Sequence, residues 1–120
     1  MAFSVYSINV NGLRDEDKRL AFFQWLSHFS PLVVCLQETR AVSSSELSSW
    51  VSRFGYLCAG SSGSNRSCGV AVLFRSVLTC RDVLCEFDGR FVLAQFEFHD
   101  SVFRVSCVHA PNRNPDRSLC

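Results

Sequence analysis

Three polar residues of this sequence, Asn9, Glu38 and His109, each lie at the carboxyl end of a stretch that is typical of a β-strand. Val33–Leu36 is a short β-branched run, typical of a buried strand, and it leads directly into Gln37 and Glu38. An acid at such a position is costly to bury unless a cation pairs with it, and a metal ion would do so. The simpler interpretation of Glu38, taken alone, is a carboxylate that meets solvent or a nearby arginine.

The side chains of a strand alternate between its two faces, so every second residue lies on the same face. Counted in this way, each of the three polar residues is the last member of an otherwise apolar row. Two strands joined by a helix run parallel, so Asn9 and Glu38 should meet at one edge of a sheet. Ligand sites of α/β sheets lie at the carboxyl edge. The three faces are Phe3, Val5 and Asn9; Val34, Leu36 and Glu38; and Phe103, Val105, Cys107 and His109.

This set of residues favours hydrolysis of a phosphodiester assisted by a hard divalent cation. Magnesium prefers oxygen ligands and often needs one or two protein carboxylates, of which Glu38 would be one. The ion would polarise a phosphoryl oxygen and stabilise the leaving alkoxide. Asn9 and Asn112 would donate to phosphate oxygens or orient the carboxylate. His109 would donate to a non-bridging oxygen or transfer a proton; the equal alternative is a strand-end histidine bonded to a backbone carbonyl.

The elements that must position these residues alternate between strand and helix. Acids in a first turn and apolar residues at three- and four-residue steps predict a helix over 15–28. Ser43, with Glu46 three residues later, predicts the start of a second helix, which Gly55 ends. Strands are expected over 3–10, 32–37, 56–59, 69–74, 78–87, 90–98 and 102–109, with a loop over 60–67 and a turn at 99–101.

The composition bounds the class of protein. A chain of 120 residues is one domain or part of one, its 48% hydrophobic content excludes a disordered segment, and its net charge of +1 gives no signal for a bulk polyanion. The seven cysteines are odd in number and form no CxxC pair, so they predict neither a zinc site nor a complete disulfide framework. The amino terminus lacks a basic flank and no apolar run reaches membrane-spanning length. We therefore expect an intracellular protein that binds no membrane.

Five segments of the chain carry a resemblance to a known enzyme family. They are INVNGLR (Ile8–Arg14), VVCLQETR (Val33–Arg40), GVAVLFR (Gly69–Arg75), GRFVLAQF (Gly89–Phe96) and HAPN (His109–Asn112). Over nearly its whole length the chain resembles the exonuclease III/abasic-site endonuclease members of the endonuclease/exonuclease/phosphatase family. It looks most like the endonuclease domain of LINE-type non-LTR retrotransposons. The resemblance implies an α/β fold, half of a four-layer sandwich of two mixed sheets covered by helices.

The resemblance also implies magnesium, or manganese, as the cofactor and the DNA phosphate backbone as the partner, which would place the protein in the nucleus. Glu38 matches the family's metal-binding glutamate, Asn9 its asparagine at the metal, and Asn112 the asparagine that contacts the scissile phosphate. The repair enzymes of the family tend to have an acid at the position of Asn11, whereas the retrotransposon members resemble this chain in having asparagine there. His109 occupies the position of a phosphate-contacting tyrosine.

The family's further Asp-x-Asn motif, its DNA-contacting segment and its closing Ser-Asp-His are not in this sequence. We therefore expect residues 1–120 to be the amino-terminal half of the domain, with no second domain and no endonuclease activity alone. The alternatives are a phosphatase or deadenylase of the same fold, and a non-catalytic remnant that binds partners. The apolar faces within 90–98 and 102–109 are expected to lie uncovered, so that the chain self-associates through this sheet.

Overall fold

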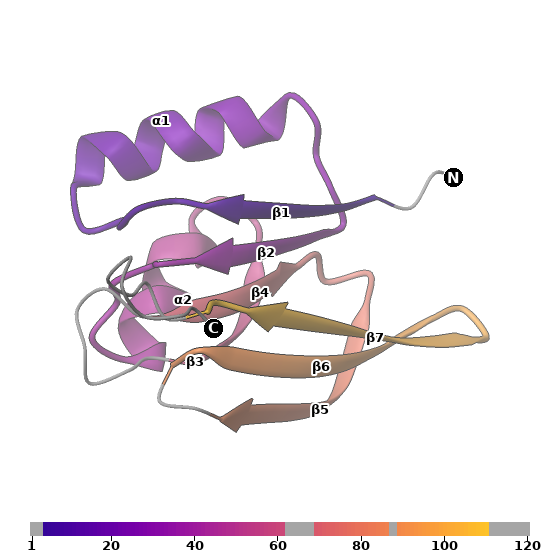
Figure 1. The fold of residues 1–120 in the computed structure, drawn as a ribbon. Coiled ribbons are helices and arrows are strands. Elements are labelled where there is room, and N and C mark those ends of the chain that lie inside the picture. Colours follow the sequence, from indigo (N-terminus) through magenta and orange to yellow (C-terminus); the bar gives the residue numbers. More distant parts are fainter. Residues whose placement is uncertain (1–3, 62–68, 87–88, 111–120) are drawn as a thin grey trace.

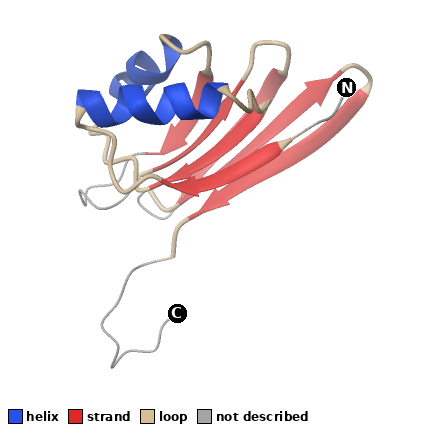
Figure 2. Cartoon of the chain, turned by 90° about the horizontal axis from the view of Figure 1, so that it is seen from above, coloured by secondary structure: helices blue, strands red, loops and turns tan. Residues whose placement is uncertain are grey.

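The fold is a sandwich of two β-sheets, with both helices on the outer face of the first sheet (Figure 1, Figure 2). The computed structural model describes residues 4–61, 69–86 and 89–110. The first sheet has the strand order β1-β2-β4-β3 and the second has the order β5-β6-β7. Within the described ranges, no helix is long and apolar enough to cross a membrane. The elements are β1 (Val5–Asn9), α1 (Glu16–Ser27), β2 (Val33–Gln37), α2 (Ser44–Ser52), β3 (Leu57–Ser61), β4 (Val70–Phe74), β5 (Thr79–Glu86), β6 (Phe91–Phe98) and β7 (Ser101–Val108).

The β1–α1–β2 unit forms as the sequence predicts. Asp15 caps the helix, because its carboxylate accepts from the backbone N–H of Asp17 at 2.9 Å and of Lys18 at 3.4 Å. The helix returns the chain so that β2 lies parallel to β1, with Asn9 opposite Gln37. The carboxyl ends of both strands therefore meet at one edge of the first sheet.

Helix α2 begins with a polar cap that also ties it to the preceding loop. Ser43 Oγ accepts from the backbone N–H of Glu46 at 3.1 Å, as predicted, and Glu46 Oε1 accepts from the N–H of Val42 at 2.9 Å. Gly55 follows the helix with a φ of +84°, which glycine adopts without the steric cost of a Cβ. The helix packs beside β3, on the same face as α1.

Two apolar cores lie on either side of the first sheet. Val34 and Leu36 belong to the core under the helices, together with Leu26 of α1. Val33 and Cys35 belong to the core between the two sheets. Strand β2 is thus buried on both faces, which explains why its first four residues are apolar without interruption.

The inner face of the second sheet corrects one expectation. We expected the alternate apolar residues of β6 and β7 to lie uncovered, but Val92, Ala94 and Phe96 are fully buried and Cys107 is nearly so. They pack against the inner face of the first sheet in a single core. The expectation assumed that each sheet needs a cover from outside the chain, whereas the two sheets of this chain cover each other. These faces are therefore not a route for self-association.

Two strand boundaries also differ from the predicted ones. Strand β3 continues through Gly60 to Ser61, where we expected a loop, because both residues pair with β4. The β6–β7 hairpin turns over His99 and Asp100 alone, with His99 at a φ of +55°. The rest of the expected loop, residues 62–67, lies outside the described residues.

Candidate functional site

Asn9 and Glu38 meet at the carboxyl edge of β1 and β2, as the parallel pairing predicts. Asn9 Nδ2 donates to Glu38 Oε2 at 2.8 Å, and Asn9 Oδ1 accepts from the backbone N–H of Asn11 at 3.0 Å. Both polar ends of the amide are engaged, so Asn9 orients the carboxylate in this arrangement. That Asn9 is itself a metal ligand stays a prediction.

Glu38 has a backbone conformation that changes where its side chain lies. Its φ of +57° is in the left-handed region, which ends the alternation of β2 at Gln37. The carboxylate meets Asn9, whose register partner Gln37 lies on the face toward the second sheet. Counting by two had placed Glu38 on the same face as Val34 and Leu36. The left-handed turn overturns this expectation, because it moves the carboxylate to the face of Asn9.

His109 follows β7 and brings an imidazole from the second sheet to the same carboxylate. Its backbone N–H donates to Arg90 O at 2.9 Å, which holds the end of β7 against β6. Its Nε2 lies 3.5 Å from Glu38 Oε2, and 15% of the side chain is exposed. The imidazole thus faces a carboxylate, where the alternative from the sequence had it bonded to a backbone carbonyl. Three of the predicted site residues, from three strands and two sheets, come together here.

Arg40 is the site residue that the sequence reasoning missed. Its Nη2 donates to Asn11 Oδ1 at 2.8 Å and lies 3.5 Å from Glu38 Oε1, the carboxylate oxygen that Asn9 does not bind. Its Nε is buried without a hydrogen-bond partner among the described residues, and its φ is +59°. Unsatisfied donors and left-handed backbone cluster at functional sites. The available signal was its place in VVCLQETR, two residues after Glu38.

The backbone after β2 is held in this conformation by neighbouring loops. Thr39 is buried, and its N–H donates to Gly69 O at 3.1 Å. Gly69 has a φ of +114°, and a Cβ there would lie 2.5 Å from Thr39 Oγ1, so the position requires glycine. Glu38 O accepts from Gly12 N–H at 2.6 Å. The carboxylate is therefore presented by a rigid loop rather than by a free strand end.

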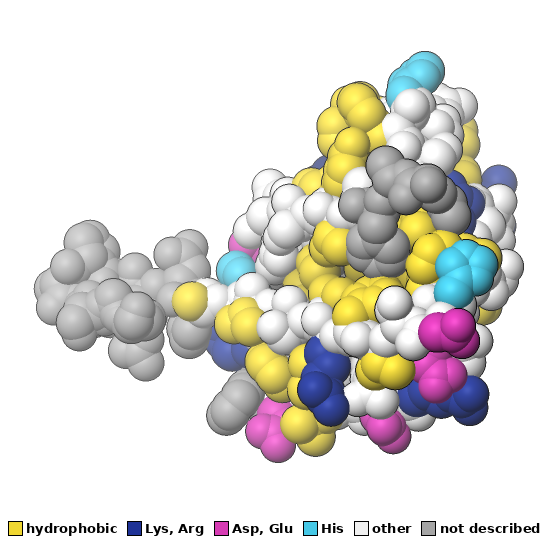
Figure 3. Space-filling view, turned by 90° about the vertical axis from the view of Figure 1, so that its right-hand side faces the viewer, with side chains coloured by type: hydrophobic (Ala, Val, Ile, Leu, Met, Phe, Trp, Pro, Cys, Tyr) yellow, Lys and Arg dark blue, Asp and Glu magenta, His cyan; other side chains and the backbone are white. Residues whose placement is uncertain are grey.

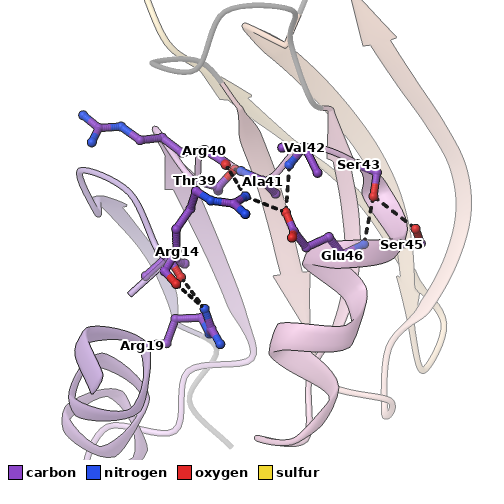
Figure 4. A network of polar contacts seen from close by, with 10 residues as sticks. Arg14, Arg19, Thr39, Arg40, Ala41, Val42, Ser43, Ser45 and Glu46 are labelled. Carbon is purple, nitrogen blue, oxygen red and sulfur yellow. Dashed lines mark hydrogen bonds and ion pairs between the residues drawn. The ribbon is translucent and has the colours of Figure 1, made fainter. Parts of the chain in front are cut away.

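Two basic side chains tie the loops next to the site to the two helices. Arg14 Nη1 lies 2.9 Å from Glu46 Oε1 and donates to Arg40 O at 3.4 Å, so it bridges the loop and the helix (Figure 4). Lys18 Nζ donates to Asn11 O at 2.8 Å. Arg14 is thus paired with Glu46, and Lys18 with a backbone carbonyl, whereas Arg40 lies beside the Glu38 carboxylate. A guanidinium in that place suits a ligand that carries phosphate.

A divalent metal ion would find one carboxylate at this edge. Nowhere in the described ranges do three His, Cys, Asp or Glu side chains gather. Glu38 is 19% exposed, and the side chains around it are N–H donors. Magnesium keeps several waters and takes as few as one or two protein carboxylates together with substrate phosphates. The residues present fit a single contribution from Glu38. Asn112, the fourth predicted site residue, lies outside the described residues.

Comparison with known proteins gives one family and several similar structures. The model of the Endonuclease/Exonuclease/phosphatase family matches residues 6–118. An AP endonuclease from Archaeoglobus fulgidus is 23% identical with a TM-score of 0.67, over 89% of this chain and 40% of that one. The Xenopus laevis APE2 catalytic domain is 20% identical with a TM-score of 0.65, over 94% and 46%. ANGEL2, a 2′,3′-cyclic phosphatase, is 16% identical with a TM-score of 0.64, over 89% and 40%. This chain spans less than half the length of each of them.

Proposed function

This chain belongs to the endonuclease/exonuclease/phosphatase family, and from that premise we propose that it carries the amino-terminal half of a site for metal-dependent phosphodiester hydrolysis. Its fold is that of the exonuclease III-like structures, over part of their length. The proposed substrate is DNA, nicked in one strand by an enzyme of the repair or retrotransposon type.

The observation that carries the proposal is the Glu38 carboxylate, held by Asn9 and faced by His109 and Arg40. A magnesium or manganese ion bound to Glu38 would polarise a phosphoryl oxygen. Asn9 would keep the carboxylate oriented. His109 would donate from Nε2 to a non-bridging oxygen or carry a proton there, and Arg40 would contact a phosphate oxygen. Asn112 would add an amide donor.

DNA as the substrate is supported by Arg40 beside the Glu38 carboxylate and by the similar structure from Archaeoglobus fulgidus, which is named as an AP endonuclease. The retrotransposon type rests on the likeness of INVNGLR and HAPN, and a nuclear location would follow from a DNA substrate.

We also propose that the 120-residue chain does not cleave DNA alone. The described residues bring one carboxylate and one imidazole to the site. A single carboxylate holds a divalent ion weakly, and no second acid is present among these residues to activate a water. The portions of the similar endonucleases that this chain does not span would correspond to the missing groups.

A small phosphorylated substrate is the second candidate. It is supported by the likeness to ANGEL2, which resembles this chain about as closely as the two endonucleases do. The third candidate is a non-catalytic remnant. The first two candidates both depend on Glu38, whereas the third does not.

The test is a fusion of this chain to the part of the Archaeoglobus fulgidus enzyme that it does not span, assayed on supercoiled plasmid with magnesium. We expect nicking that Glu38→Gln abolishes without changing the circular dichroism. Glu97→Gln is the matched control, because it removes a carboxylate that pairs with Arg81 at 2.9 Å on the other end of β6. Undiminished nicking by the Glu38 variant at saturating magnesium would overturn the assignment. Hydrolysis of 2′,3′-cyclic nucleotides without nicking would support the second candidate, and inactivity towards both would support the third.

A further inference from the structure

A row of polar side chains lies between the two sheets, next to the candidate site. Strands β1, β2 and β7 each contribute one side chain to it, and all three strands run toward the end of the sandwich that carries the site (Figure 1). The row consists of Ser7, Gln37 and Cys107, which precede the site residues Asn9, Glu38 and His109 by two, one and two residues. The backbone between the row and the site is short, so a shift of the row displaces the site as well.

Hydrogen bonds through this row join the second sheet to the first. Gln37 Nε2 donates to Ser7 Oγ at 3.1 Å and to Cys107 Sγ at 3.5 Å. Cys107 Sγ donates in turn to Leu36 O at 3.2 Å. The thiol is thus an acceptor toward a side chain of β2 and a donor toward the backbone of the same strand. We call the Gln37 amide, the Cys107 thiol and the Leu36 carbonyl the clasp.

The clasp requires that Cys107 keep its proton, because a thiolate cannot donate to a carbonyl. Cys107 is 1% exposed. The neighbouring Cys35 thiol, followed by burial, raises the pKa of the Cys107 thiol well above its ordinary range. The thiol therefore stays neutral near pH 7, and both hydrogen bonds of the clasp persist there.

The other end of the sandwich is joined by apolar contacts. Side chains that belong to the core between the sheets or pack against it there are Leu32, Phe74, Leu78 and Phe98. Figure 3, which views the end where β1 begins, shows hydrophobic side chains gathered at the surface. Apolar packing is non-directional and tolerates a small shift of one sheet over the other, whereas hydrogen bonds restrict both distance and angle. The clasp thus fixes the position of β7 at the end that carries the site.

We propose that Gln37 and Cys107 are positioning residues, which hold His109 at the carboxylate of Glu38. The imidazole and the carboxylate come from different sheets, and their Nε2 and Oε2 atoms lie 3.5 Å apart. A satisfied polar network inside a core restricts the core to one arrangement. The clasp therefore sets the distance between these two groups. The clasp stands on geometry alone, whereas its meaning for catalysis rests on the proposed function.

The consequence for catalysis is a loss that acts through His109. In the fused enzyme, Gln37→Met removes the amide donor and keeps an unbranched side chain of similar length. A misplacement of about 1 Å can cost about a hundredfold in rate, and for this variant we expect kcat to fall about tenfold with little change in KM. In the His109→Ala background, the same substitution should lower kcat no further. A fall of equal size in both backgrounds would overturn the proposal.

The test of position is NMR spectroscopy of the full 120-residue chain, without metal or substrate. Asn9 Nδ2 and His109 Nε2 lie 2.8 and 3.5 Å from the same oxygen, Glu38 Oε2. We therefore expect a nuclear Overhauser cross-peak between the amide protons of Asn9 and the ring protons of His109, called here the site cross-peak. Gln37→Met and Cys107→Ala should each abolish it.

Two further variants separate position from stability. Cys107→Ser leaves nearly the same volume as Cys107→Ala, but its hydroxyl accepts and donates as the thiol does, so it should keep the site cross-peak. Val33→Ala removes buried methyl groups from the same face at the start of β2, so it should lower stability and keep the site cross-peak. A cross-peak between the rings of Phe74 and Phe96, whose centroids lie 5.0 Å apart across the two sheets, reports that each variant is folded.

Each possible result decides the proposal. A site cross-peak that is missing from the unchanged chain, that survives Gln37→Met, or that disappears in Val33→Ala would overturn it. A Cys107→Ser variant that behaves as Cys107→Ala does would show that the thiol only fills space. Loss of both cross-peaks in Gln37→Met would show that the amide supports the fold rather than the position of His109. None of these results depends on activity, so an inactive fused enzyme would overturn the proposed function and leave the clasp standing.

Discussion

The carboxyl edge of the sandwich and the core between its sheets differ in almost every physical respect. At the edge, Asn11, Glu38 and Arg40 all have positive φ values and polar side chains, and a buried donor of Arg40 has no partner among the described residues. In the core, the strands are regular and the inward side chains are apolar and buried. Left-handed backbone and unsatisfied donors each cost stability, and they persist where the surrounding structure determines them.

This difference teaches which residues serve stability and which serve a site. The core packs tightly around residues that could be exchanged for others of like volume. The edge holds one carboxylate in a fixed place with donors on both of its oxygens. Substitutions in the two regions should therefore separate cleanly, with loss of stability from the core and loss of activity from the edge.

The largest effect is expected from the core. Phe96 is fully buried between the sheets, and its ring centroid lies 5.0 Å from that of Phe74 and 5.5 Å from that of Phe103. Phe96→Ala removes most of this packing and leaves a cavity, so the free energy of unfolding should fall by about 3–5 kcal/mol. Urea denaturation measures it. A loss below about 1 kcal/mol would mean that the two sheets do not pack as described.

The edge should give the opposite result. In the fused enzyme, His109→Ala should lower the nicking rate, because one donor to the phosphate is removed. The expected loss of transition-state stabilisation is about 2–4 kcal/mol. His109→Tyr should raise the rate, since the tyrosine hydroxyl reaches further. Thermal unfolding should change little for either variant. His28→Ala, at the end of α1, is the control that should leave the rate unchanged. Equal rates for all of these would make His109 a strand-end residue only.

Much of the core could be predicted from the sequence because periodicity encodes it. The continuous apolar run of β2 and the alternation of β6 and β7 indicated strands at the right places. The parallel pairing also predicted that Asn9 and Glu38 share an edge. Periodicity could not show that the second sheet folds over the first, because which faces meet depends on contacts distant in sequence. It also could not give the left-handed turn at Glu38, since nothing in the residue type marks it. Arg40 was missed because its place in VVCLQETR, two residues after Glu38, gave no sign that the turn would bring its guanidinium back to the carboxylate.

A smaller effect should come from the loop that supports the carboxylate. Gly69→Ala forces a Cβ against Thr39 Oγ1 at a φ that side chains rarely adopt, so it should cost about 1–3 kcal/mol of stability. Gly55→Ala is the control, because Gly55 has a similar left-handed φ of +84° and a Cβ there would meet only the Nη1 end of the Arg75 side chain. Activity of the fused enzyme should fall with Gly69→Ala even at temperatures where it stays folded. Equal stability of the two variants would show that this loop is not rigid.

The smallest effect should be seen at the junction of the edge with α2. The Val42 N–H, followed by Arg14, lowers the pKa of Glu46 from its ordinary value of 4.5. A carboxyl group with a lowered pKa in the folded state stabilises the fold above its unfolded pKa, and this contribution disappears as pH falls through the folded value. Glu46→Gln keeps the acceptor for Val42 and removes only the charge. Because the Glu46 and Arg14 side chains are 26% and 52% exposed, water screens the pair, and the variant should lose well under about 1 kcal/mol at pH 7 and less than that at pH 3. Urea denaturation at both pH values, repeated in about 1 M salt to screen the charge, measures this difference. A loss that is the same at pH 3 and pH 7 would show that the side chain supports the loop by its shape alone.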